Sequence, residues 1–488
     1  MSSGECRTRS WRFCAMTFLH RRTRQTKSSG DCFEEYTACF RGRKSERSMT
    51  KQMMIGVALG NGYGAQNSAW RMPWVDPANY TSFDSQVRYA QAAERGKFQF
   101  LFLPDYPALK GDVAMEAPWV SLEPMLTLAA IARETNRIGL VATGSTTFNE
   151  PYNLARQFKT LDIMSHGRVG WNAVPSWDPA VAANFGRQLP PREEKYQRLH
   201  EVVQLVQALW GSWERDAWVL DTASGQFADP AKIKPINLSG RHVGARGPLP
   251  LPPSEQGQPV IFQAGGGGNG LEVAGRYATG VMGAPQTMED ARHQRSELRA
   301  AAQRAGRDPD EIKYFAGIMT TVASDRRAGL DRRILLTEHT FADRVVYLGQ
   351  MLGLRLESAS LDAPLSPEQL AAARPSPADP RSVYALQVAR EGWNLRDVLA
   401  HGVIEFHPAI AGPSIEIADF MQAWFEADAA DGFWVVPDVF EDGIDAFVDG
   451  VVPILQERGL FHRDYEGHTL RHHLGAPAQY GTDTRVLG

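Results

Sequence analysis

Residues 138–176, IGLVATGSTTFNEPYNLARQFKTLDIMSHGRVGWNAVPS, contain one complete strand–helix–strand pattern. The runs 138–145 and 168–176 are apolar along most of their length, which is typical of parallel strands covered on both faces. Between them, residues 153–167 repeat apolar positions at helical spacing. This order predicts a βαβ unit of a parallel sheet.

Similar strand and helix patterns follow one another through most of the chain. Helical spacing recurs at residues 84–97, 123–136, 193–213 and 414–432. Eight runs have the character of buried strands: 52–60, 98–105, 138–145, 168–176, 259–265, 280–285, 313–322 and 431–438. Eight strand–helix units predict an α/β fold in which the strands close into a (β/α)8 TIM barrel.

Two long segments interrupt this alternation. Residues 214–258 contain PLPLPP, and residues 324–412 contain RPSPADP within mixed helical sequence. Insertions in such barrels often form lids over the carboxyl ends of the strands, where ligands bind. Surface decoration is the alternative interpretation. We expect a single barrel domain over residues 49–478, followed by a tail at 479–488.

The first 48 residues differ in composition from the rest. They carry 11 Lys or Arg against 5 Asp or Glu, about +6, whereas residues 49–488 carry 41 against 51, about -10. Strand-like sequence begins only after Met49. We expect a basic, disordered extension; translation from upstream of Met49 and an organelle transit segment are the other interpretations.

The composition of the remaining chain excludes several classes of function. An acidic body lacks the electrostatic footprint of a nucleic-acid-binding protein, and no run of eighteen apolar residues could span a membrane. All four cysteines precede Met49, which excludes thiol chemistry from the body and favours a cytoplasmic location. The histidines near the C-terminus lack the spacing of metal ligands, so we expect no metal.

The stretch FQAGGGGNG at residues 262–270 joins an apolar run to a segment whose helical periodicity resumes at Leu271. This position makes it a strand-to-helix turn and not a linker. Glycines in such a turn expose backbone N–H groups, and the helix N-terminus adds partial positive charge, so that a phosphate can bind there. A tight packing turn would explain the same glycines.

Several longer blocks resemble a known family. FLFLPDYPALKG at 100–111, ATGSTTFNEPYNLAR at 142–156 and SHGRVGWN at 165–172 are similar to bacterial-luciferase-like flavin-dependent monooxygenases. More narrowly, they resemble the branch of nitrilotriacetate monooxygenase component A and dibenzothiophene-sulfone monooxygenase. ADFMQAWFEADAADGFWVVPD at 418–438 fits the same branch, and the resemblance runs from about Met49 to about Pro477.

The resemblance implies a two-component monooxygenase. In this family a separate NAD(P)H:flavin reductase supplies reduced FMN, which reacts with molecular oxygen to a flavin peroxide that oxidises a small organic substrate. C–N or C–S cleavage accompanies this chemistry in the branch. The resemblance also implies a homo-oligomer. A deazaflavin-dependent oxidoreductase of the same fold and a catalytically silent flavin-binding protein stay open as alternatives.

The resemblance matches the family's flavin-binding residues with specific positions of this sequence. It assigns no catalytic residue. Asp105 matches the aspartate that ends the second strand, Thr143 matches a threonine in the third, and Tyr196 matches a tyrosine in the helix after the fourth. Gly266 and Gly267 fall in the matching phosphate loop. Asn172 is added because it ends the fourth strand, where a buried amide needs partners.

Some positions depart from the family pattern. Arg192, which we include among the cofactor-binding residues, stands where relatives usually carry histidine, and Gly267 stands where they carry serine. An arginine still donates charged hydrogen bonds and a glycine still offers its N–H, but one hydroxyl donor is lost. The loop GYGAQNSAWRMP at 62–73 also lacks the family's histidine, so it does not identify the substrate.

Each assignment has a purely structural alternative. Asp105 can cap a loop, Thr143 can pack as a β-branched strand residue, and Tyr196 can belong to the core of its helix. Four tryptophans near predicted loop ends can wall an apolar substrate pocket or can simply be half-buried: Trp70, Trp74, Trp171 and Trp177.

Overall fold

Eight parallel strands close into a barrel, as the sequence predicts. The computed structural model describes residues 51–66, 68–109, 113–264, 267–357 and 359–483, so the basic segment 1–48 lies outside the described residues. The barrel strands are β1 (Met54–Ala58), β2 (Phe100–Leu103), β3 (Gly139–Ser145), β4 (Val169–Val174), β9 (Val260–Ala264), β10 (Gly280–Gly283), β11 (Lys313–Val322) and β13 (Gly432–Pro437). Each strand pairs in parallel with the next in this order, and β13 pairs with β1, which closes the ring.

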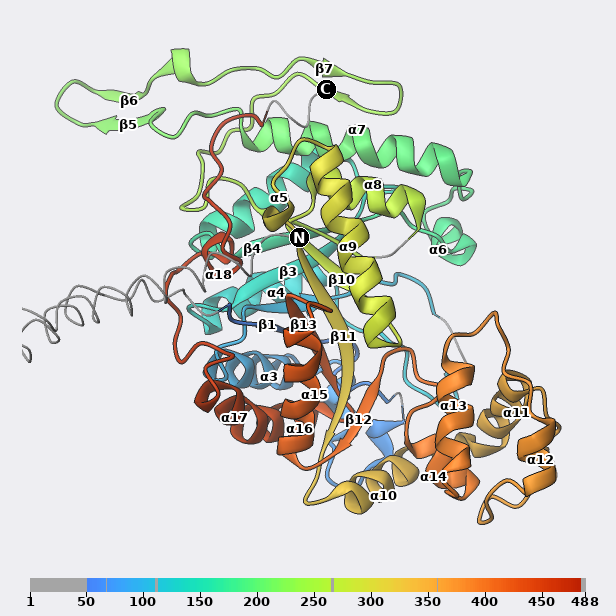
Figure 1. The fold of residues 1–488 in the computed structure, drawn as a ribbon. Helices are drawn as coiled ribbons and strands as arrows, with labels where there is room; N and C mark the ends of the chain where they lie inside the picture. Colours follow the sequence, from blue (N-terminus) through green and yellow to red (C-terminus); the bar gives the residue numbers. More distant parts are fainter. Residues whose placement is uncertain (1–50, 67, 110–112, 265–266, 358, 484–488) are drawn as a thin grey trace, which may run out of the picture. The chain divides into compact units, whose positions relative to one another are not determined.

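Helices connect the strands and cover the barrel from outside (Figure 1). The longer ones are α3 (Phe83–Arg95), α4 (Pro124–Glu134), α5 (Pro151–Met164), α7 (Arg192–Trp210), α8 (Gly268–Tyr277), α9 (Met288–Arg304) and α15 (Ser414–Glu426). Shorter ones are α6 (Pro179–Asn184), α16 (Phe440–Ala446), α17 (Val452–Glu457) and α18 (Leu470–His473). Among the described residues, no helix combines the length and the apolar composition needed to cross a membrane.

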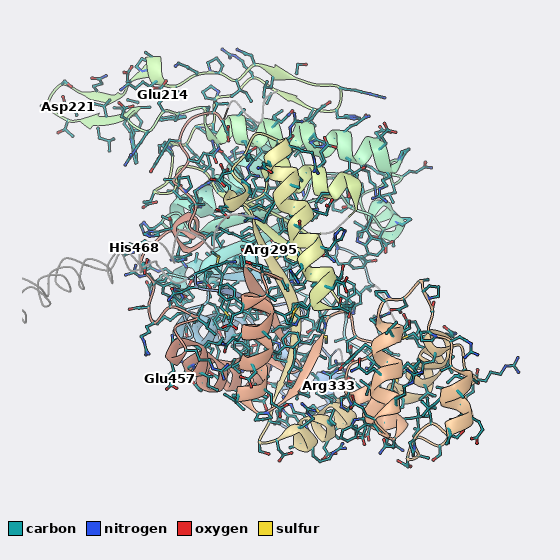
Figure 2. All side chains as sticks on the ribbon, viewed as in Figure 1. Glu214, Asp221, Arg295, Arg333, Glu457 and His468 are labelled. Atoms are coloured by element: carbon teal, nitrogen blue, oxygen red, sulfur yellow. The ribbon has the colours of Figure 1, made fainter. Side chains whose placement is uncertain are left out.

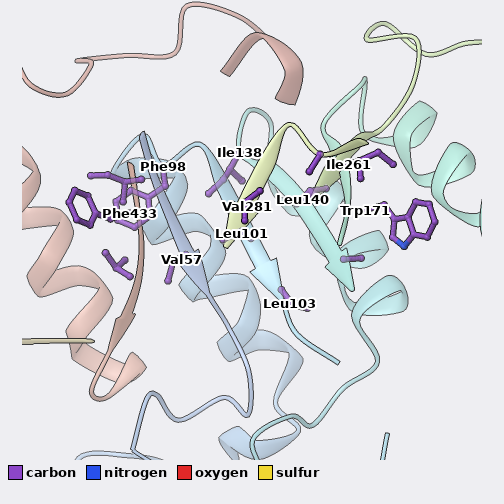
Figure 3. Packing of buried hydrophobic residues seen from close by; sticks show 14 of the residues in the cluster. Val57, Phe98, Leu101, Leu103, Ile138, Leu140, Trp171, Ile261, Val281 and Phe433 are labelled. Atoms are coloured by element: carbon purple, nitrogen blue, oxygen red, sulfur yellow. The ribbon is translucent and has the colours of Figure 1, made fainter. Parts of the chain in front are cut away.

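Outward-facing strand residues and the covering helices share the largest hydrophobic core. Val57, Leu101, Leu140 and Ile261 belong to it and are at most 2% exposed (Figure 3). On β4, Trp171 faces this helix side, so its neighbour Asn172 faces the barrel interior. Because both faces of each strand are buried, the strand sequences are continuously apolar instead of alternating with polar residues.

Large aromatic side chains fill the barrel interior. Phe100 lies 5.1 Å from Phe262 and 5.0 Å from Phe315 between ring centroids. Gly56 makes room for Phe100, because a Cβ there would lie 2.3 Å from a ring carbon. Leu470 of α18 packs into the same interior cluster at the amino-terminal end. The space for a ligand therefore lies at the carboxyl-terminal mouth.

The first insertion, residues 214–258, lies against the outer surface. It holds two antiparallel pairs that were not predicted, β5 (Trp218–Asp221) with β6 (Gln226–Ala228) and β7 (Leu238–Ser239) with β8 (Gly244–Ala245). Glu214 and Asp221 mark the first pair in Figure 2. Glu201 of α7 accepts hydrogen bonds from the amides of Arg241, His242 and Val243 at 2.7–3.1 Å. Because the segment follows α7 and leads into the start of β9, the expectation of a lid is wrong here.

The second insertion, residues 324–412, follows β11 and therefore lies at the carboxyl-terminal end. It contains α10 (Arg326–Thr337), α11 (Phe341–Leu352), α12 (Pro367–Ala372), α13 (Arg381–Arg390), α14 (Leu395–Ala400) and β12 (Ala409–Gly412). Its helices bury a hydrophobic cluster of their own around Leu348, Leu386 and Leu399. Strand β12, which was not predicted, pairs with the end of β11 outside the closed ring.

A buried ionic network fixes this insertion to the barrel. One carboxylate oxygen of Glu405 accepts hydrogen bonds from Arg333 at 3.1 Å, Arg344 at 2.5 Å and Gln66 at 3.4 Å. The side chains of Arg333 and Glu405 are 2% and 12% exposed. Gln66 belongs to the loop after β1, so the network holds the chain around Glu405 beside the barrel mouth.

Candidate active site

Two cavities open at the carboxyl-terminal end of the barrel. The larger cavity, about 760 Å³, is lined by residues of β2, β9, β10, β11 and β13, by the start of α8 and by the middle of α9. The smaller cavity, about 320 Å³, is lined by the segments that follow β2, β3 and β4. Small-molecule sites have volumes of about 300–1,000 Å³, so either cavity can take part in ligand binding.

Thr143 and Asn172 face the barrel interior from adjacent strands. They are register partners on β3 and β4, and Asn172 Nδ2 donates a hydrogen bond to Thr143 Oγ1 at 3.0 Å. Their side chains are buried, and Asn172 Oδ1 has no hydrogen-bond partner among the described residues. An unused buried acceptor is costly unless a ligand donates to it. The pair thus presents a buried amide oxygen without a hydrogen-bond partner among the described residues toward the barrel interior.

Asp105 follows β2 and lines the smaller cavity together with Thr143. Burial, followed by the nearby Glu123 carboxylate, raises the pKa of Asp105 to about 6, and a hydrogen bond from the Tyr106 amide opposes the shift. A carboxyl group with this pKa can hold or release a proton close to neutral pH. Within the described part of the chain, no group of three or more His, Cys, Asp or Glu residues is arranged to hold a metal ion.

Arg192, Tyr196 and Gly267 meet at the starts of α7 and α8. The guanidinium carbon of Arg192 lies 5.9 Å from the ring centroid of Tyr196, whose ring also packs against the main core. Gly267 precedes α8 with φ 83° and ψ 169°, and a Cβ there would lie 3.4 Å from Arg192 Nη2. Gly266, the other glycine assigned to this turn, lies outside the described residues.

The start of α8 has the properties of an anion site. No side chain caps this helix, and its first turn contains no acidic residue. Its first backbone N–H groups therefore keep their hydrogen-bonding capacity, and the helix dipole and Arg192 add positive charge. This arrangement, beside the larger cavity, fits the phosphate of a flavin nucleotide.

The walls of the larger cavity come mostly from residues that the sequence did not single out. Trp434 on β13 lies 6.1 Å from Phe102 on β2 between ring centroids, and its Nε1 donates to the Gly283 carbonyl at 3.0 Å. Phe406 from the second insertion lines the same cavity. Residues 431–438 are apolar on both faces of the strand, so the sequence could not tell whether Trp434 faces the interior. Phe406 carries no periodic signal either.

The four tryptophans near the predicted loop ends line neither cavity. Trp171 is fully buried on the helix side of β4, where its Nε1 donates to the Gly144 carbonyl at 3.0 Å. Trp74 packs on the exterior with the Arg332 guanidinium 5.4 Å from its ring centroid. The interpretation of Trp70, Trp74, Trp171 and Trp177 as a substrate wall is therefore wrong.

Comparison with known proteins agrees with this barrel fold. The profile of the family described as luciferase-like monooxygenase matches residues 55–389. Dibenzothiophene-sulfone monooxygenase of Rhodococcus erythropolis is 36% identical over 454 residues, which cover 88% of this chain and 98% of that protein. Nitrilotriacetate monooxygenase component A of Aminobacter aminovorans is 37% identical over 442 residues, covering 87% and 96%.

A solved structure extends the comparison to a bound flavin. Riboflavin lyase, crystallised with modified FMN and its substrate riboflavin, superposes with a TM-score of 0.71 at 28% sequence identity, covering 88% of this chain and 97% of that chain. The resemblance inferred from the sequence blocks is thus confirmed. The family profile matches more than half of this chain, and both relatives align with it over almost their whole length. This chain therefore belongs to the luciferase-like monooxygenase family.

Proposed function

We propose that this protein is the oxygenase component of a two-component flavin monooxygenase. It takes reduced FMN from a separate NAD(P)H:flavin reductase and uses molecular oxygen to oxidise a small organic substrate. The observation that carries the proposal is the meeting of Arg192, Gly267 and the uncapped start of α8 at the edge of the larger cavity. A phosphorylated ring system requires an anion site and an apolar cavity side by side.

The relatives support the cofactor and the partner. The riboflavin lyase structure contains modified FMN, and the name of the nitrilotriacetate relative denotes one component of a larger system. The relatives do not agree on a substrate. One is named for an uncharged aromatic sulfone and the other for an amine with three carboxylates.

The residues of the site have separable tasks in this proposal. Arg192 and the first amides of α8 bind the phosphate, and Asn172 Oδ1 accepts a hydrogen bond from the edge of the ring system. The Asp105 carboxyl holds or releases a proton in the smaller cavity. Phe102 and Trp434 exclude water from the mouth. The chemistry that bound reduced FMN supplies is two-electron activation of oxygen, with one oxygen atom entering the substrate and the other leaving as water.

Anaerobic titration with reduced FMN and reduced riboflavin tests this proposal, because only FMN carries the phosphate. Arg192→Ala should weaken the affinity for reduced FMN by about tenfold or more, which is the contribution of a charge-assisted hydrogen bond. The affinity for reduced riboflavin should be nearly unchanged. Arg187→Ala, which removes an exposed arginine of the preceding loop, is the matched control.

Mixing the anaerobic complex with oxygenated buffer then tests the oxygen chemistry. Flavin absorbance should return to the oxidised spectrum more slowly than for free reduced FMN, and oxygen uptake should depend on substrate. Failure to bind reduced FMN would exclude the proposal. Turnover with a reduced deazaflavin alone would favour hydride transfer, and tight flavin binding without substrate-dependent oxygen uptake would favour a silent binding protein.

A further inference from the structure

The charges around the two cavities indicate which class of substrate can bind there. This inference rests on the proposed function. No lysine or arginine lines either cavity within the described ranges. The carboxylates of Glu297, Asp105 and Glu123 do line them. The inventory covers both cavities and therefore applies to the space that a bound flavin leaves within them. A separate cavity between the second insertion and α15 is lined by Arg326 and Arg381, which pair with Glu416 and Asp379.

Five arginines and lysines of the segments around the mouth already have other partners or are assigned to the phosphate. Arg198 donates to the Thr146 and Asn149 carbonyls at 3.0 and 3.3 Å. Lys195 donates to the Ser176 carbonyl at 2.9 Å. Arg333 and Arg344 both bind Glu405, and Arg192 lies at the phosphate end beside Gly267. These contacts leave no arginine or lysine among them to meet an acidic substrate in the cavities.

A histidine of the second insertion lies at the mouth without adding charge. The His407 ring lies 4.5 Å from the Trp434 ring between centroids and is 5% exposed. Burial lowers the pKa of His407 to about 3, so the ring is neutral at pH 7. The wall formed by Trp434 therefore carries no positive charge on this side.

The remaining wall of the larger cavity suits an aromatic ring. Phe102 and Trp434 present edge and face to each other with an interplanar angle of 76°, and the hydrogen bond to the Gly283 carbonyl fixes the indole. Phe406, which is 71% exposed, and Met282 of β10, which is buried, line the same cavity. Aromatic side chains in this arrangement favour ring ligands by apolar burial and by ring-to-ring contact.

We propose that the substrate is an uncharged aromatic molecule and that a carboxylate on a compound prevents its tight binding. A carboxylate entering either cavity would lose its hydration, meet no lysine or arginine in the lining and face other carboxylates, which is a costly combination. Of the two substrates for which the dibenzothiophene-sulfone and nitrilotriacetate relatives are named, the uncharged sulfone matches these walls and the tricarboxylate does not.

Direct binding of probe compounds tests this inference without any need for turnover. Dibenzothiophene sulfone, nitrilotriacetate and the matched pair biphenyl and biphenyl-4-carboxylate are titrated into the full chain, with protein fluorescence or dialysis as the readout. The uncharged member of each comparison should bind more tightly by at least about tenfold. Phe406→Arg places a cation at the edge of the larger cavity. It should therefore reduce, for each comparison, the ratio of the affinity for the uncharged compound to the affinity for the carboxylate. Phe227→Arg, on the exposed β5–β6 hairpin and 63% exposed in the parent, should leave both ratios unchanged.

The outcomes separate this inference from the proposed function. Equal or tighter binding of the carboxylates would overturn the substrate class, and so would a lack of binding by both uncharged probes. An unchanged ratio in Phe406→Arg would also count against it, because the larger cavity would then not be the binding site. The proposed function is judged independently by the anaerobic titration with reduced FMN.

Discussion

Replacing Gly267 by alanine changes the phosphate turn with little added bulk. Gly267 has φ 83° and ψ 169°, a region of backbone conformation that is populated essentially only by glycine, and another residue there costs about 1–3 kcal/mol. A Cβ would lie 3.4 Å from Arg192 Nη2, which is ordinary contact, so sterics add little to this cost. If the turn relieves the strain by rotating its N–H groups away from the phosphate, reduced FMN binds about 5- to 150-fold more weakly.

Gly268→Ala provides the matched control one residue further on. Gly268 is the first residue of α8, its backbone is not left-handed, and a Cβ there would meet no atom within 4 Å. Alanine should therefore be neutral or should stabilise the helix by about 0.5–1 kcal/mol. Anaerobic calorimetric titration of reduced FMN and urea unfolding compare both variants with the wild type. Equal FMN affinity in the two variants would refute a phosphate site at this turn, and lost stability with unchanged affinity would refute the link between turn geometry and binding.

Three further substitutions test other features of the structure. Asp105→Asn should flatten the pH dependence of stability: the pKa rises from 3.8 to about 6 on folding, so the folded protein binds this proton more tightly, and wild-type stability falls as pH increases through that window. Urea unfolding at a series of pH values measures the slope, and an unchanged slope would contradict the buried setting of Asp105. Glu405→Leu should cost about 3–5 kcal/mol because it leaves two buried guanidinium groups without their carboxylate. Glu416→Gln, in a pair with side chains 58% and 37% exposed, should cost about 0–1 kcal/mol. Thermal unfolding compares the two variants, and equal losses would contradict the role of the network. Gly317→Ala should cost about 1–3 kcal/mol, since its Cβ would lie 2.6 Å from the His407 ring. Adding His407→Ala removes the ring and should restore part of the lost melting temperature. If the melting temperature is not restored, the His407 ring is not the cause of the destabilisation.

The barrel strands could be predicted because burial on both faces leaves a strong signal in the sequence. On β4, Trp171 packs outward against the helices and Asn172 points inward, so both positions are buried and the run remains largely apolar. Strand β12 has only four residues, and it forms because β11 extends past the ring and offers an edge. Its pairing depends on tertiary structure, which local periodicity does not contain.

The same distinction applies to the candidate site. Asp105 could be located from its place at a strand end, because barrel topology puts strand ends together, and the glycine turn from its composition. Thr143 is assigned mainly from the family resemblance, because packing alone could explain a β-branched residue in a strand. Phe406 could not be located in this way. Its position follows from the contact between Glu405 and Gln66, which are 339 residues apart in the sequence. The sequence also indicated lids for both insertions, although only the one after β11 begins at the carboxyl end of a strand.

The two sides of the mouth are held by different parts of the structure. The start of α7 carries Arg192 and the start of α8 carries the glycine turn, and both helices pack on the barrel core. Phe406 is held by the second insertion, through the ion pairs of Glu405 and a helical cluster separate from the barrel core. A change in the insertion can therefore alter the wall proposed to meet the substrate without moving the groups assigned to the phosphate. This separation gives a physical reason why relatives that share the barrel can be named for substrates as different as an aromatic sulfone and a tricarboxylate.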